Sequence, residues 1–157
     1  MKQANNFVDD GLDNQVFDFC RHVSGSAKIT AAAYVDNYLA TPAKEKSIMH
    51  IILIIQAFQP RVMSYITSVN QRTIFVFAVD QRTFERDIEI GILGEAMASK
   101  LVFPYTALRG EVYLRDKEVA LKKRLILELI ENLAASFPEL TTRMLIKPQY
   151  FLYGHNN

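Results

Sequence analysis

A nearly uninterrupted apolar stretch at residues 48–58 constrains the fold of this chain more than any other feature of its sequence. The stretch is rich in isoleucine and is interrupted by His50 and Gln56. A short apolar run without alternating polar residues is typical of a β-strand that is covered on both faces. It is too short for a membrane helix, which needs about 20 apolar residues. The stretch therefore predicts the central strand of a sheet with further layers on both sides.

The segments around this strand predict a helix and three more strands. Small and β-branched residues at 29–39 indicate a strand before the central one. Two further strands, at 62–69 and 73–79, are joined around Asn70-Gln71 and predict a hairpin after it. A short helix is expected before these strands. Asp13 is placed to cap its start, and Gly25 suits the position just past its end. Its apolar residues share one face: Val16, Phe19, Cys20 and Val23.

Beyond Asp80 the apolar residues follow helical spacing. Asp80 is placed to cap a helix, which Gly91 and Gly94 would bend or divide. Residues 111–136 predict the longest helix, and residues 142–147 predict either a last strand or a short helix. One face of the long helix is expected to carry a line of leucines, formed by Leu114, Leu121, Leu125, Leu129 and Leu133.

Length and composition fit one α+β domain, residues 1–157, with a core at about 12–80 and a mainly helical extension at about 81–157. Eighteen basic and seventeen acidic residues create no net field for nucleic acid or a membrane, and neither partner is expected. The basic run at 122–124 lies among glutamates and predicts a solvated helix face. A lone Cys20 and the lack of a secretory leader predict the cytoplasm. The apolar surplus favours a symmetric homodimer or a protein partner.

A motif frame occurs within residues 34–55. One strand ends in Asp36-Asn37, and about ten residues later a second strand opens with Ser47, Ile48 and His50. This frame resembles that of the polymerase-β-type nucleotidyltransferase superfamily, in which the first strand ends in Gly-Ser and the second opens with Ser-Asp-x-Asp. The resemblance implies a mixed sheet with helices packed on it. It also implies that the former active-site positions are Asp36, Asn37, Ile48 and His50.

The residues at these positions differ from those that carry the family's chemistry. The family's glycine lets the backbone approach a triphosphate, whereas Asp36 adds a side chain and a negative charge there. The family's aspartates bind two magnesium ions, but Ile48 offers no ligand and His50 offers a nitrogen that magnesium binds poorly. The strand at 73–79 contains no carboxylate, and Asp80 only follows it. We therefore expect no catalytic residue, no metal site, no cofactor, and weak nucleotide binding at most.

The other candidate residues are better explained by structural roles. His50 is expected to be a hydrogen-bonded histidine of an apolar strand, not a transition-metal ligand. Cys20 is expected to be a small apolar helix residue, not a nucleophile. Glu85 and Glu89 share a helix face with nearby arginines, and they predict surface ion pairs instead of a cation site. The aromatic residues at 150–153 are expected to pack on the core or on a second subunit, not to stack on bases.

Three functions are consistent with this sequence. The first is a pseudoenzyme: an inactive nucleotidyltransferase-like domain that acts as a binding, regulatory or assembly module. The second is an active metal-dependent nucleotidyltransferase that uses displaced carboxylates such as Asp36 and Asp80. The third is a structural or protein-interaction domain in which the helix at 111–136 forms a dimer face. We favour the first, because every ligand position of the motif has changed while its frame remains.

Overall fold

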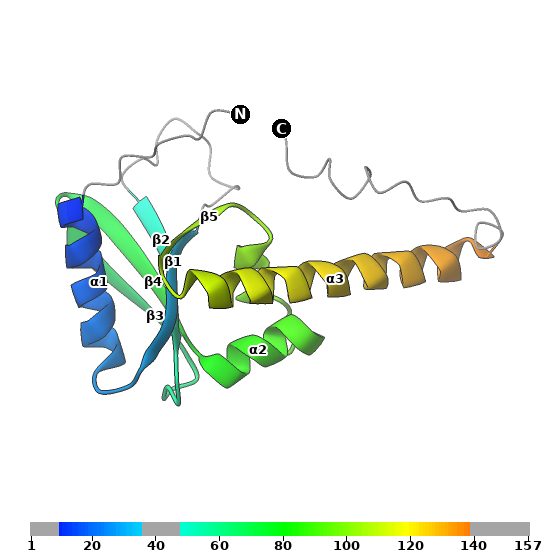
Figure 1. Ribbon diagram of the computed structural model, residues 1–157, viewed down its shortest axis with the longest axis horizontal. Helices are drawn as coiled ribbons and strands as arrows, with labels where there is room; N and C mark the ends of the chain where they lie inside the picture. The colour runs from blue at the N-terminus through cyan, green and yellow to red at the C-terminus, as the bar shows by residue number, and fades with distance from the viewer. Residues whose placement is uncertain (1–9, 36–47, 139–157) are drawn as a thin grey trace.

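The computed structural model describes residues 10–35 and 48–138 (Figure 1). It contains a five-stranded mixed sheet with strand order β3-β4-β2-β1-β5, in which the strands are β1 (Ile29–Val35), β2 (Ile48–Ile55), β3 (Val62–Val69), β4 (Arg72–Asp80) and β5 (Tyr105–Arg109). The helices are α1 (Asp10–Ser24), α2 (Gln81–Ile90), the 3₁₀ helix η1 (Ala98–Leu101) and α3 (Glu111–Ser136). Helix α1 covers one face of the sheet, and the others lie on the opposite face. The predicted α+β class with a long final helix is confirmed.

Strand β2 is the central strand, as its apolar run predicts. It pairs in parallel with β4 and antiparallel with β1. Residues 51–55 are fully buried and alternate between the α1 side and the α2 and α3 side of the sheet. The strand ends at Ile55, earlier than residue 58, because Ala57 adopts a left-handed backbone with φ of 54°. The backbone N–H of Phe58 then donates to the Asp80 carboxylate at 3.0 Å.

The predicted hairpin of β3 and β4 is confirmed. Its two strands pair in an unbroken register from Val62 opposite Val79 to Val69 opposite Arg72. Asn70 and Gln71 both have positive φ, which matches a two-residue turn whose twist suits a hairpin. Strand β3 thereby becomes one edge of the sheet.

Two local predictions need correction. Helix α1 begins at Asp10, so Asp13 does not cap it; instead its carboxylate accepts a 2.7 Å hydrogen bond from the Tyr34 hydroxyl. Strand β5 was not expected from the sequence, because it is only five residues long and follows Pro104 closely. Its partner in the sheet is β1, which lies far away along the chain.

Helix α2 begins where the sequence predicts, and it ends at Gly91, one of the two glycines expected to bend or divide it. The Asp80 carboxylate caps it by accepting from the Thr83 backbone N–H at 3.2 Å, and Gly91 ends it in the left-handed conformation. The segment that follows is organised by Asp87, whose carboxylate is fully buried. It accepts hydrogen bonds from four backbone N–H groups, those of Leu93, Glu95, Met97 and Ala98. This segment leads into η1 and then into β5.

Candidate functional site

The structure places two of the four positions that the resemblance to nucleotidyltransferases singles out. Ile48 and His50 open β2, and Asp36 and Asn37 lie outside the described residues. Side chains alternate along a strand, so Ile48 and His50 lie on the same face as Ile52 and Ile54. That face is the one covered by α2 and α3.

The surroundings of His50 are aromatic. Its ring lies 5.5 Å from that of Phe75 and 6.0 Å from that of Phe77, and it is stacked with the second. The Lys100 ammonium lies over the Phe77 ring, 5.5 Å from its centre. In the described part of the chain, no group of three or more His, Cys, Asp or Glu side chains is positioned to hold a metal ion. These contacts favour a packed histidine over a metal ligand.

Asp80 lies at the opposite end of the central strands from His50. Along the parallel pair of β2 and β4, Ile48 lies opposite Thr73 and Ile55 lies opposite Asp80. Seven residues of strand separate these two ends by about 23 Å. The Asp80 carboxylate is buried and accepts hydrogen bonds from the loop before β3 and from the first turn of α2. Its role in this structure is to join two segments of backbone.

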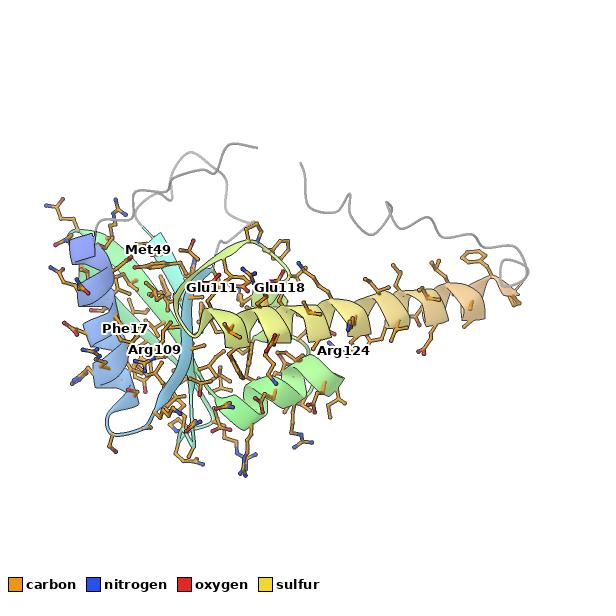
Figure 2. All side chains as sticks on the ribbon, in the orientation of Figure 1. Phe17, Met49, Arg109, Glu111, Glu118 and Arg124 are labelled. Atoms are coloured by element: carbon orange, nitrogen blue, oxygen red, sulfur yellow. The ribbon has the colours of Figure 1, made fainter. Side chains whose placement is uncertain are left out.

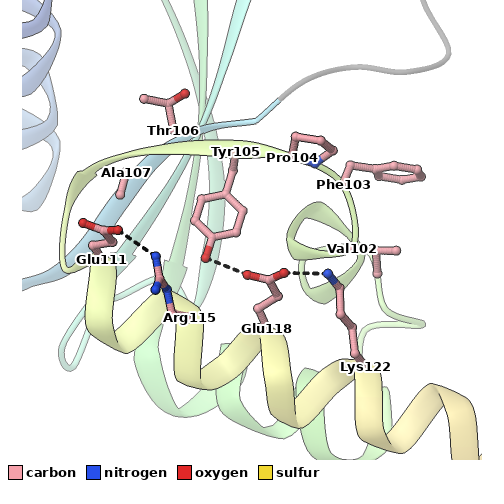
Figure 3. Close-up of a pocket in the computed structure, with 10 residues that line it drawn as sticks. All are labelled: Val102, Phe103, Pro104, Tyr105, Thr106, Ala107, Glu111, Arg115, Glu118 and Lys122. Carbon is pink, nitrogen blue, oxygen red and sulfur yellow. Dashed lines mark hydrogen bonds and ion pairs between the residues drawn. The ribbon is translucent and has the colours of Figure 1, made fainter. Parts of the chain in front are cut away.

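A pocket of about 560 Å³ opens between the segment 102–107 and the first half of α3 (Figure 3). Its charged groups neutralise one another. Arg115 pairs with Glu111 at 3.1 Å, and Glu118 pairs with Lys122 and accepts a 3.0 Å hydrogen bond from the Tyr105 hydroxyl. These contacts leave no charged group unpaired among the lining residues.

The titration of this pocket follows from the same contacts. Burial by itself would raise the pKa of Glu118, but the hydrogen bonds from Lys122 and Tyr105 outweigh burial and hold that pKa below its usual value. Burial and the neighbouring Glu118 carboxylate raise the pKa of Tyr105 to about 12. At neutral pH the tyrosine is therefore a protonated donor and the glutamate an ionised acceptor.

Helix α3 carries two lines of apolar residues, and only one of them packs against the sheet. Leu114 and Leu121 are fully buried, and both lie in the first half of the helix. A second line lies two positions away, which is about 200° around a helix and thus nearly opposite. Its members recur at seven-residue intervals: Val112, Val119, Ile126 and Leu133. Val112 is 76% exposed and Val119 is 47% exposed.

The second half of α3 extends away from the sheet and past the end of α2 (Figure 1). Arg124, near the middle of the helix in Figure 2, pairs with Glu95 at 2.6 Å and with Glu128 at 3.3 Å. Beyond Arg124, Leu127 and Leu129 are exposed. The leucine line predicted from the sequence is therefore correct at Leu114, Leu121 and the partly buried Leu125, and wrong at the exposed Leu129. The prediction also placed Leu133 on this line, whereas its spacing assigns it to the second line. The seven-residue spacing of the second line was visible in the sequence, but the prediction followed the more numerous leucines instead.

The remaining candidate residues have structural contacts. Cys20 is fully buried, and burial raises the pKa of its thiol to about 12, so it is uncharged at neutral pH. Glu85 pairs with Lys117 of α3 at 3.2 Å and not with the arginines of its own helix. The aromatic residues at 150–153 lie outside the described part of the chain. Among the helices that the structure describes, none combines the length and the apolar character that a membrane span requires.

Comparison with known proteins adds no family assignment. A scan against models of protein families and a search of curated proteins both find no match. Three features therefore bear on function: the second apolar line of α3, which is exposed at Val112 and Val119, the paired pocket beside it, and the aromatic surroundings of His50.

Proposed function

We propose that this chain is a nucleotidyltransferase-like domain without catalytic chemistry, and that it acts as an assembly module by joining two copies through α3. The observation that carries this proposal is the second apolar line of α3, which begins with the exposed Val112 and Val119. Apolar residues repeated every seven positions are the pattern by which two helices pack along a seam. The helix has 26 residues and is about 39 Å long, which is ample for such a seam.

The charges on α3 favour an antiparallel pair. The basic residues Lys122 and Lys123 precede the acidic Glu128 and Glu131 along the helix. In a parallel pair, Lys123 would face its own copy, and like charges would oppose association. In an antiparallel pair centred near Leu127, Lys123 of one copy lies beside Glu131 of the other. A second copy of this chain is thus a complementary partner for its own helix.

The absence of catalytic chemistry is supported by the environment of the former metal positions. Ile48 and His50 share one face of β2, as the nucleotidyltransferase alignment requires, but neither supplies an oxygen ligand. The rings that contact His50, those of Phe75 and Phe77, do not supply one either. The free energy needed to remove water from magnesium is therefore not offset by contacts with such a surface.

Sedimentation velocity with two neighbouring variants tests the assembly. Val119→Glu places a charge on the exposed line, whereas Ala120→Glu places the same charge about 100° away around the helix. Both positions are exposed in one copy, so neither change should unfold it. We expect Val119→Glu to weaken the dimer at least ten-fold and Ala120→Glu to leave it unchanged. A monomeric wild-type chain at about 50 μM, the upper range for a weak dimer, or equal effects of both variants, would contradict the proposal.

Thermal shift with magnesium and each of ATP, GTP, CTP and UTP tests the active alternative. A nucleotide at 100 times its dissociation constant would stabilise the fold by about 2.7 kcal/mol. We expect no such shift, and a clear magnesium-dependent shift or nucleotide transfer would favour an active enzyme with displaced carboxylates. The double variant Ile48→Asp with His50→Asp tests the alignment itself. Restored divalent-ion binding supports a nucleotidyltransferase ancestry, and its absence favours an interaction domain of other origin.

A further inference from the structure

Strand β3 forms a sheet edge that lacks the features by which proteins usually block edges. Exposed edges are commonly protected by charged residues, proline, a bulge or a very short strand. The eight residues of β3 (Val62–Val69) include no charge, no proline and no glycine. Their register with β4 has no shift from one end to the other. Within the described part of the chain, the outer side of β3 has no partner strand.

The opposite edge of the same sheet shows the contrast. Strand β5 has five residues, its register with β1 shifts between Ala32 and Ala33, and it ends in a charged residue. That residue, Arg109, reaches back over the Phe17 ring of α1, with its guanidinium carbon 5.7 Å from the ring centre (Figure 2). Among the described residues, one edge of the sheet is thus protected and the other has no partner strand.

The open edge also exposes apolar side chains on both faces of the sheet. Ile66 is 65% exposed on the face of α2 and α3, and Met63 is 41% exposed on the face of α1. An added strand would cover part of both side chains and would pair the outward backbone groups of β3. The edge therefore offers main-chain pairing and apolar contact together.

We infer that β3 pairs antiparallel with β3 of a second copy, about a two-fold axis that passes between the two Ile66 residues. Opposite residues in such a pair lie on the same face of the sheet. This register matches apolar with apolar and hydroxyl with hydroxyl over residues 63–69: Ile66 with Ile66, Tyr65 with Thr67, Ser64 with Ser68, and Met63 with Val69. Only Val62, at the end of the strand, lies opposite a polar residue, Asn70. Beyond the strand, Arg61 lies opposite the neutral Gln71, so no like charges meet.

Neighbouring registers lack this match. With Tyr65 on the axis, Ser64 would oppose Ile66 and Met63 would oppose Thr67. With Thr67 on the axis, Ile66 would oppose Ser68. A strand that is complementary to itself in one register is expected if its partner is a copy of itself, and a foreign strand imposes no such requirement. The second copy is therefore the occupant that the sequence of β3 favours.

This contact is separate from the α3 pair and does not depend on it. Helix α3 and strand β3 lie on different parts of the molecule (Figure 1). If both contacts form, each copy has two different partners and the assembly grows beyond a dimer. Either contact can then be removed while the other remains.

Disulfide crosslinking of the full-length chain tests the register directly. In the inferred pair, residue 66 lies opposite its own copy at a Cα separation of about 5 Å, which a disulfide can span. Residue 64 lies about 14 Å from its copy, and residue 65 more than about 7 Å, and neither distance can be bridged. With oxidised glutathione, we expect covalent dimers of Ile66→Cys at several times the yield of Ser64→Cys and Tyr65→Cys. A yield at position 66 no higher than at position 64 or 65 overturns the inference.

Sedimentation separates this contact from the α3 contact. Ile66→Lys should remain folded, because Ile66 is exposed in a single copy. In the Val119→Glu background, which lacks the α3 contact, we expect a residual dimer that Ile66→Lys converts to monomer. A monomer before Ile66→Lys is added, or a dimer that persists after it, overturns the β3 contact. Ile66→Lys in the otherwise wild-type chain keeps the α3 contact and reports on it alone, so the two proposals fail independently.

Discussion

Removal of the Asp87 carboxylate is the perturbation whose effect the structure predicts most directly. This side chain is fully buried at the inner face of α2 and holds the segment between α2 and η1. One carboxylate oxygen accepts from the backbone N–H groups of Leu93 at 2.8 Å and Glu95 at 3.1 Å. The other accepts from those of Met97 at 3.2 Å and Ala98 at 2.9 Å. In Asp87→Ala, all four donors lose their acceptor at once.

The magnitude follows from these four contacts. A hydrogen bond to a charged group contributes about 1.5–3 kcal/mol, so independent losses would total about 6 kcal/mol or more. Entry of water and movement of the segment recover part of this, and we expect Asp87→Ala to cost about 4 kcal/mol of unfolding free energy. Asp87→Asn keeps one acceptor oxygen for two of the donors and should cost about 2 kcal/mol. Because small domains have about 5–15 kcal/mol of stability, the alanine variant is expected to be marginal and the asparagine variant folded.

Urea unfolding followed by circular dichroism, at one fixed protein concentration, measures both losses. Glu89→Ala is the matched control, because it removes an exposed carboxylate from the same helix and should change stability by less than about 0.5 kcal/mol. If Asp87→Ala costs less than about 1 kcal/mol, the carboxylate does not organise this segment and the reasoning is refuted.

Three further predictions concern other parts of the fold. A Cβ at Gly110 would overlap the Thr30 carbonyl oxygen, so Gly110→Ala should cost about 2 kcal/mol or more in urea unfolding. Gly25→Ala, which has a similar φ but open space around it, should cost only about 1 kcal/mol. Because burial raises the pKa of the Cys20 thiol to about 12, that thiol should react with a thiol reagent at pH 8 only after unfolding; rapid labelling of the folded protein would contradict this. Burial raises the pKa of Tyr34, Tyr105 and Tyr113 above the usual value of 10. As the pH rises above 10, the unfolded chain therefore loses these protons before the folded chain does, and the free energy of unfolding should fall. Equal urea midpoints at pH 9 and pH 11 would exclude that linkage.

Features that depend on neighbouring residues could be predicted from the sequence. The apolar run of β2 marks a strand that is buried on both faces, and the turn at Asn70-Gln71 marks a hairpin. The cap at Asp80 and the bounds of α3 depend on interactions within a few residues. The same reasoning failed at Asp13, because its carboxylate bonds to Tyr34 of the next strand and not to its own helix.

Features that depend on distant pairing were decided by the tertiary structure alone. Strand β5 forms because it pairs with the edge of β1, and its five residues are too few to show a strand pattern in the sequence. The strand order determines that β3 is an edge of the sheet in the described part of the chain, although its residues alone are typical of any strand.

Helix α3 shows the same division between sequence and structure most clearly. The sequence determined a long helix with two apolar lines, because helical spacing and capping act locally. It did not determine which line meets the sheet, since both lines are apolar at the start of the helix, with Leu114 and Leu121 on one and Val112 and Val119 on the other. The packing of α2, η1 and the sheet around Leu114 and Leu121 decided that question. Burial is a property of the whole fold, so the line that remains exposed, and with it the proposed assembly surface, became visible only in three dimensions.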